Sequence, residues 1–198
     1  MTARRSQGGD ADATRRDILR AAGSLFLERG YAATTTRSVA REVGLTPAAA
    51  VHHFGRKHEL YLAVTESIQW EVYEIIEGIV DQRGALIDKI EQILRIDEHR
   101  TGDEPGYLRF LSSVGMETSL HPELVPALSQ VPFDELFGRL VADGVASGEV
   151  SAEQGPLLIR ALRVLLAGIG LSTWDLPGAH SPADACVALV RGLLILPR

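Results

Sequence analysis

Two threonines, two histidines and a lysine near the start of the chain have the types and spacing to contact a polyanion. Thr35 and Thr36 precede a short apolar pattern, where a helix start would present main-chain N–H groups to phosphate oxygens. Lys57 opens a later pattern, and the helix dipole does not favour a cation there, so phosphate contact is one reading and solvated surface the other. His52 and His53 are adjacent and cannot form the i, i+4 pair that binds zinc. We expect phosphate contacts and no metal site.

Three short helices are predicted around these residues. Apolar side chains recur at helical spacing over about 14–29, which predicts the first helix. A second helix follows the threonines and is closed by Gly44. Thr46 is then an N-cap with Pro47 at the first helical position, so a third helix of about seven residues should end near His53. Because so few residues separate the second and third helices, the sequence predicts a helix-turn-helix.

The apolar periodicity of the rest of the chain also predicts helices. A long apolar repeat predicts a helix from Lys57 to about Val80, with inward residues at Leu60, Val64, Ile68, Val72, Ile75 and Ile79. Further helices are expected over 85–99, 107–119, 122–130, 133–146, 154–171 and 182–194. No alternating strand pattern is present, so the fold class is all-α. We expect a flexible basic arm over 1–13, a helix-turn-helix domain over 14–56 and a helical domain over 57–198.

Composition restricts the classes of protein to which the chain can belong. Residues 1–60 hold ten Lys/Arg and six Asp/Glu, a net charge of +4, whereas residues 61–198 hold ten and twenty, a net charge of −10. A basic head on an acidic body is typical of a chain that binds phosphates at one end. The single cysteine cannot form an internal disulfide. The sequence indicates no membrane span and no secretory signal, so we expect a cytoplasmic protein. It also contains no cofactor motif, so we expect no cofactor.

Residues 14–64 resemble the DNA-binding domain of TetR-family (tetracycline-repressor-type) regulators. The resemblance rests on the ILxAAxxLFxExGYxATTxxxVAxxxGL pattern from Ile18 to Leu45, followed by HHFxxKxxL, and covers about a quarter of the chain. It implies a homodimer that binds a palindromic double-stranded DNA operator and is controlled by a small-molecule effector. The remainder of the chain is similar to the family only in helix number, length and one loop.

The third helix departs from the family pattern. Val51 stands where a tyrosine commonly precedes the histidines, and Pro47 is followed by three alanines. Few side chains there can read bases by hydrogen bonds, so apolar contacts from Ala48 or Ala49 to thymine methyls would supply much of the direct readout. The residues expected to contact DNA are Thr35, Thr36, Arg37, Thr46, Pro47, Ala48, Ala49, Val51, His52, His53 and Lys57. Arginines 4, 5, 15 and 16 could form a minor-groove arm or a solvated tail.

The C-terminal portion offers candidates for an effector pocket and a dimer interface. Ligand sites between helices are mostly apolar. Each large side chain there could instead belong to the core; those expected to line a pocket are Trp70, Tyr73, Tyr107, Phe110, Met116, Phe133, Phe137 and Trp174. The last two predicted helices are apolar around most of their circumference, which predicts burial against a second subunit. The interface residues expected are Leu158, Leu162, Leu165, Ile169, Val190 and Leu193.

Taken together, the sequence predicts a ligand-responsive transcriptional regulator, a repressor released by a mostly apolar effector. An enzyme is disfavoured because the chain has no Walker A loop, nucleophile elbow, HExxH or dinucleotide fingerprint. A third reading keeps the helix-turn-helix as a protein-binding module, and the apolar run from Pro47 to Ala50 is its best support.

Overall fold

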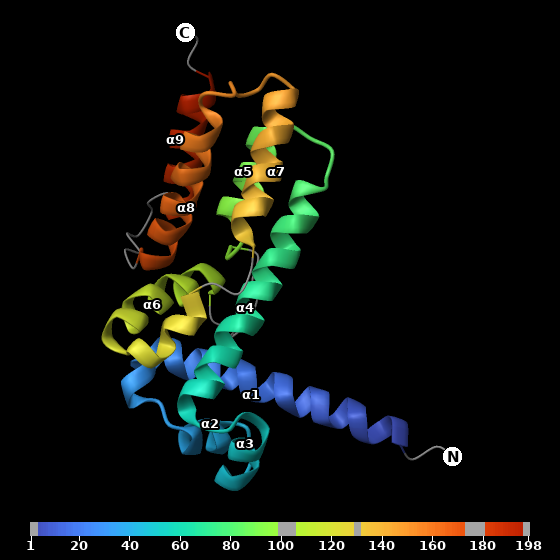
Figure 1. The fold of residues 1–198 in the computed structure, drawn as a ribbon, viewed down its shortest axis with the longest axis vertical. Coiled ribbons are helices and arrows are strands. Elements are labelled where there is room, and N and C mark those ends of the chain that lie inside the picture. Colours follow the sequence, from blue (N-terminus) through green and yellow to red (C-terminus); the bar gives the residue numbers. More distant parts are fainter. Residues whose placement is uncertain (1–3, 99–105, 129–131, 173–180, 196–198) are drawn as a thin grey trace. The chain divides into compact units, whose positions relative to one another are not determined.

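The structure is a computed structural model that describes residues 4–98, 106–128, 132–172 and 181–195 (Figure 1). Within these ranges the regular elements are helices and there is no strand, so the predicted all-α class is confirmed. Their bounds are α1 Arg4–Ala33, α2 Thr36–Glu42, α3 Pro47–Phe54, α4 Lys57–Val80, α5 Leu86–Leu94, α6 Tyr107–Leu120, the 3₁₀ helix η1 Pro122–Leu128, α7 Phe133–Ala146, α8 Gly155–Leu171 and α9 Pro182–Ile195.

The described residues form two compact units. The first unit holds residues 4–68 and 113–128, and the second holds 69–98, 106–112, 132–172 and 181–195. Helices α4 and α6 each begin in one unit and end in the other. This grouping differs from the expected domains in that the first unit includes the start of α4 and a segment that lies far along the chain.

Helix α1 begins earlier than predicted. Residues 4–13, which we expected to belong to a flexible arm, are helical, and Thr14, near which the helix was expected to begin, lies inside α1. The stretch has no proline, so no residue there removes a helical N–H. The regular part of α1 ends at Gly30, whose φ of 76° lies in the left-handed region that glycine adopts most readily. The hydroxyl of Thr34 then donates to main-chain oxygens of Leu25 and Gly30 and holds the turn to α2.

The first unit has its own small core. Ile18, Ala22 and Phe26 on α1 are buried, as are Val39 and Ala40 on α2, which packs against α1. Tyr31 and Phe54 are also buried in this unit. From α4, Tyr61 meets the rings of Phe26 and Tyr31 edge-on, at centroid distances of 4.9 and 5.3 Å. Helix α4 therefore supplies part of the core beneath the helix-turn-helix.

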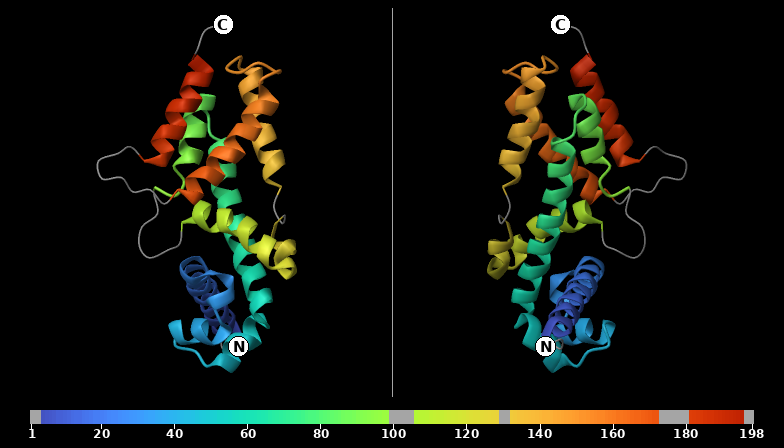
Figure 2. Two further views of the ribbon diagram at one scale, coloured as in Figure 1. Left: turned by 90° about the vertical axis from the view of Figure 1, so that its left-hand side faces the viewer. Right: turned by 90° about the vertical axis from the view of Figure 1, so that its right-hand side faces the viewer.

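The second unit is a bundle in which α5 packs against α7, α8 and α9, and α7 packs against α8. The turned views of Figure 2 show α9 beside α5. On α4 the inward residue is Ile76, which is 1% exposed, and not the predicted Ile75, which is 39% exposed. At Gly170, an added Cβ would lie 2.1 Å from the main-chain oxygen of Leu108, so α8 and α6 approach more closely here than any side chain permits. Among the described helices, none is both long and apolar enough to span a bilayer.

Candidate nucleic-acid interface

Helix α2 starts with a reciprocal cap. The N–H of Ser38 donates to Thr35 Oγ1 at 3.0 Å, and the N–H of Thr35 donates to Ser38 Oγ at 3.1 Å. These two bonds satisfy donors that a helix start leaves without intrahelical partners. Thr35 is thus the N-cap of α2, and the first turn of the helix is fixed.

The turn between α2 and α3 follows from one glycine. Gly44 has φ of 69°, which lets the chain reverse directly after α2. The N–H of Leu45 then donates to the oxygen of Ala40 at 2.8 Å, and Thr46 Oγ1 accepts the N–H of Ala49 at 3.3 Å. Thr46 is the predicted N-cap of α3. The two helices pack closely, so the predicted helix-turn-helix is confirmed.

Most predicted contact residues on these helices are accessible. Thr36 and Ala49 are half-buried, and the side chains of Pro47 and Val51 lie outside the described set. The exposed ones are Thr35, Arg37, Thr46, Ala48, His52 and His53. Sequence reasoning missed Arg41, which is exposed one helical turn after Arg37, and the i, i+4 spacing was the signal for it.

Lys57 has an internal role that the sequence did not predict. Its Nζ donates to the main-chain oxygens of Tyr31 at 2.9 Å and Ala32 at 3.1 Å, and lies 4.2 Å from the centre of the Tyr31 ring. The ammonium thus satisfies carbonyl groups where α1 ends, and it also gains a cation–π contact. These interactions with Tyr31 and Ala32 explain why a lysine stands at the start of α4, where the helix dipole disfavours it. A contact with phosphate is not needed to explain this position.

Residues of the segment 113–128 also contact Tyr31. Glu117 Oε1 accepts the N–H of Tyr31 at 2.8 Å, and the ring of His121 lies 4.8 Å from that of Tyr31. Burial, followed by the nearby charge of Glu123, raises the pKa of the Tyr31 hydroxyl. Burial also raises the pKa of Tyr61. Both phenols therefore stay neutral in the core of the first unit.

The residues predicted to bind an effector are only partly brought together. Trp70, Tyr73, Phe133 and Phe137 form a continuous aromatic row in the second unit, with successive ring centres 5.5, 6.1 and 6.4 Å apart. Tyr107 and Phe110 are buried in the same unit, where the Tyr107 hydroxyl donates to Glu71 at 2.8 Å. Met116 belongs to the first unit and is exposed, and Trp174 lies outside the described residues.

The residues predicted for the dimer interface differ in how much of each side chain a single subunit leaves exposed. Leu158, Leu162 and Val190 are buried inside the second unit, because α8 and α9 pack against its other helices. Leu165 and Ile169 are half-buried, and the side chain of Leu193 lies outside the described set. The exposed apolar residues of the same helices are Leu157, Val164, Leu171 and Leu189. The first three are spaced by seven residues and form one stripe along α8.

Among the described residues there is no group of three or more His, Cys, Asp or Glu that could hold a metal ion. What the site does present is a capped helix-turn-helix with two accessible arginines on α2 and two histidines on α3. Such a unit can place α3 in the major groove of DNA and helix starts against phosphates.

Residues 18–64 match the family model described as "Bacterial regulatory proteins, tetR family". The chain is 35% identical over 78 residues to the HTH-type transcriptional repressor AcnR of Corynebacterium glutamicum, covering 38% of this chain and 42% of that protein. It is 32% identical over 103 residues to the HTH-type transcriptional activator FasR of Mycolicibacterium smegmatis, covering 48% and 44%. The chain thus spans about half, or less, of the curated relatives that it matches.

Solved structures are similar over nearly the whole chain. A TetR/AcrR-family regulator from Thermobifida fusca superposes with a TM-score of 0.63 at 25% identity, covering 93% of this chain and 98% of that one. AibR, solved in complex with isovaleryl coenzyme A and operator DNA, superposes with a TM-score of 0.58 at 16% identity, covering 93% and 100%, which shows the shared fold. AcnR, FasR and the Thermobifida fusca protein are named as transcriptional regulators, and none of the three is named as an enzyme. Together with the helix-turn-helix geometry, these similarities show that residues 18–64 form a helix-turn-helix domain of the tetR family of bacterial regulatory proteins and that the chain is similar in fold to TetR-family regulators.

Proposed function

We propose that the protein is a homodimeric transcriptional regulator that acts in the cytoplasm, binds a palindromic DNA operator and is released from it by a small, mostly apolar effector. The observation that carries the proposal is the capped α2–α3 pair with its accessible polar residues. The similarity of residues 18–64 to the tetR family supports it, because the relatives AcnR and FasR are named as transcriptional regulators.

Recognition of the operator would depend on few hydrogen bonds. Arg37 on α2 can bind a guanine edge, and His52 or His53 on α3 can donate to bases or phosphates. Ala48 is exposed at the start of α3 and fits contact with a thymine methyl. Because Thr35 Oγ1 already accepts a main-chain N–H, its hydroxyl hydrogen is the part left to reach a phosphate.

A second subunit would be held by the stripe of Leu157, Val164 and Leu171 together with Leu189. These side chains are between 54% and 71% exposed, so a single chain leaves them in water. A two-fold contact through this surface would be self-complementary, and it would let two α3 helices reach half-sites about 34–36 Å apart.

An effector would bind in the second unit against the aromatic row that runs from Trp70 to Phe137. Trp70 is 43% exposed, which is unusual for a tryptophan in a helical bundle and leaves its face free for a ligand. The AibR complex contains both an acyl-coenzyme A and operator DNA, which supports effector control in a protein of this fold. Repression is proposed because AcnR is named as a repressor, although FasR is named as an activator.

The test is selection of operator sequences from random duplex DNA, followed by binding measurements over a range of salt concentrations. Affinity should fall with salt with a log–log slope of about −0.9 per neutralised phosphate. Arg37→Ala should cost about 1–3 kcal/mol and relax one base position, whereas Arg109→Ala, at an exposed position of α6, is the matched control. If no DNA sequence were enriched and the helix-turn-helix bound another protein instead, the alternative hypothesis of a protein-binding module would be favoured.

A further inference from the structure

Lys89 on α5 is the one charged side chain that is buried among the residues whose exposure the structure describes, with 7% exposed. Removing an ammonium group from water is costly unless it gains partners. Its Nζ donates to the main-chain oxygen of Val80, the last residue of α4, at 2.7 Å. The described carboxylates all lie beyond ion-pair distance of this nitrogen. The bond to Val80 is the one hydrogen bond that this nitrogen makes with the described residues, so two of its three N–H donors have no acceptor among them.

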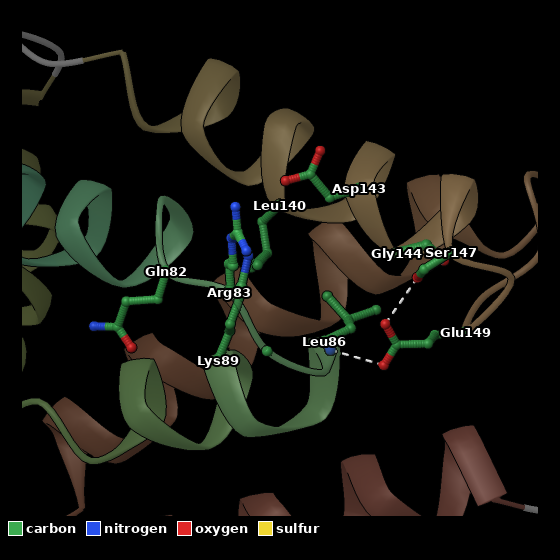
Figure 3. A pocket seen from close by; sticks show the side chains of 10 residues that line it. Gln82, Arg83, Leu86, Lys89, Leu140, Asp143, Gly144, Ser147 and Glu149 are labelled. Atoms are coloured by element: carbon green, nitrogen blue, oxygen red, sulfur yellow. Dashed lines mark hydrogen bonds between the residues drawn. The ribbon is translucent and has the colours of Figure 1, made fainter.

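Lys89 lines a pocket of about 280 Å³ in the second unit (Figure 3). The pocket is formed by the turn between α4 and α5, the start of α5, the end of α7 and the loop after it. Leu86 and Leu140, both buried, contribute apolar walls. The lining residues are Gln82, Arg83, Gly84, Leu86, Lys89, Leu140, Asp143, Gly144, Ser147 and Glu149.

The other charged residues of the pocket differ in whether they already have partners within the protein. Glu149 is occupied, because its Oε2 accepts the N–H of Leu86 at 2.7 Å and its Oε1 accepts the Ser147 hydroxyl at 2.8 Å (Figure 3). Its negative charge is thus offset by the start of α5. Arg83 and Asp143 are exposed and make no ion pair in the described structure. Water screens these two charges more than it screens the buried ammonium.

We propose that this pocket binds a small organic anion whose carboxylate or phosphate group meets Lys89 and Arg83. The ammonium supplies two hydrogen bonds in a desolvated place, where a charged pair is stronger than at the surface. The short apolar part of the ligand lies against Leu86 and Leu140. A pocket of about 280 Å³ lies just below the usual range for ligand sites, which restricts the ligand to a small metabolite.

The site is separate from the surfaces proposed for DNA, effector and dimer contacts, because the pocket shares none of their residues. Capping of α4 alone would explain one hydrogen bond of Lys89 but not its burial beside an apolar-walled pocket. Asp143 opposes an anion, so its removal should act in the direction opposite to removal of Arg83. That pair of opposite signs is specific to an anion site.

The test is titration of the ¹⁵N-labelled full chain with butyrate and with inorganic phosphate at constant ionic strength, following the amide signals of Gly84 and Leu86. n-Butanol is the uncharged control. Saturable shifts are expected with at least one anion and not with butanol. A response to phosphate alone would assign a phosphate-bearing ligand, and a response to butyrate would assign a carboxylate.

Variants distinguish the site from general salt effects. Arg83→Gln should weaken binding about two- to fivefold, Asp143→Asn should tighten it by a similar factor, and Arg160→Gln on α8 should leave it unchanged. Lys89→Met should weaken it at least about tenfold. Absence of saturation with both anions, or equal binding by the Arg83 and Asp143 variants, would overturn the proposal. Operator binding, measured on the same samples, reports separately on the proposed function.

Discussion

A carboxylate oxygen of Glu117 accepts the main-chain N–H of Tyr31 at 2.8 Å, although 86 positions separate the two residues. The bonded N–H directly follows Gly30, where the regular part of α1 ends. Tyr31 also offers its main-chain oxygen to Lys57 and its ring to His121. The connection from α1 to the helix-turn-helix is therefore held from α4 and from the end of α6 at once.

Loss of the Glu117 carboxylate should loosen this connection. We expect Glu117→Ala to reduce the free energy of unfolding of the first unit by about 1–2 kcal/mol, because a partly buried N–H loses its acceptor. Hydrogen exchange of the Tyr31 amide should become faster. Glu117→Gln keeps an acceptor oxygen and should have a smaller effect. Unchanged protection of that amide in the alanine variant would show that the bond contributes nothing.

Lys57 should act on stability and not on phosphate contact. Lys57→Met should reduce the free energy of unfolding by about 1–3 kcal/mol, because carbonyl oxygens at the end of α1 lose a charged donor. The salt slope of DNA binding should stay the same. A slope reduced by about 0.9 would instead assign a phosphate contact to this lysine. Arg56→Gln removes a neighbouring exposed charge and is the control for stability.

The apolar stripe on α8 makes a prediction about oligomeric state. Val164→Glu places a charge at a side chain that is 71% exposed, so the subunit should fold normally but sediment as a monomer and lose operator binding. Leu162→Glu changes a fully buried position two residues earlier and should unfold the second unit. Sedimentation velocity and circular dichroism separate the two results. A Val164→Glu dimer as tight as wild type would place the interface elsewhere.

The contact between α9 and α5 should weaken in acid. Hydrogen bonding from Arg95 holds the pKa of Asp184 below its ordinary value, and hydrogen bonding from Arg191 does the same for Glu91. Because the unfolded state then binds more protons in the acid range, this stabilisation is present above about pH 4 and is lost as pH falls through the lower folded-state values. Urea unfolding measured over roughly pH 3 to 6 should show this decrease in the free energy of unfolding.

Variants identify the groups responsible for this pH dependence. Asp184→Asn and Glu91→Gln should each flatten the profile, whereas Asp88→Asn, which removes an exposed carboxylate of α5, should not. An equally steep profile in the first two variants would assign the acid sensitivity to other carboxylates.

Local signals in the sequence were sufficient for much of the fold. The caps at Thr35 and Thr46 depend on residues within one turn, so α2 and α3 could be placed closely. The limits of α4, Lys57–Val80, agree with its apolar repeat. The choice between Ile75 and Ile76 was missed because both suit a helical period, and only the packed neighbours decide which one is buried.

Contacts between distant segments could not be predicted in this way. The periodicity of α8 carries little information because the helix is apolar on most sides, so it could not indicate that Leu158 and Leu162 face the subunit's own core. Lys57 was interpreted from its charge and its place at a helix start, since nothing in the spacing shows that the end of α1 lies within reach of its ammonium. For the same reason, neither Glu117 nor the buried Lys89 could be recognised beforehand.

The discontinuous first unit has a consequence for synthesis of the protein. Residues up to Ile68 are translated before Ser113–Gln130, and the intervening stretch of roughly 45 residues takes about 2–9 seconds at 5–20 residues per second. During that interval the Tyr31 N–H has no Glu117 carboxylate to bind, and the ring of Tyr31 has no His121 beside it. A newly made helix-turn-helix therefore becomes fully supported only after α6 and η1 have left the ribosome, so its maturation follows synthesis of a later segment.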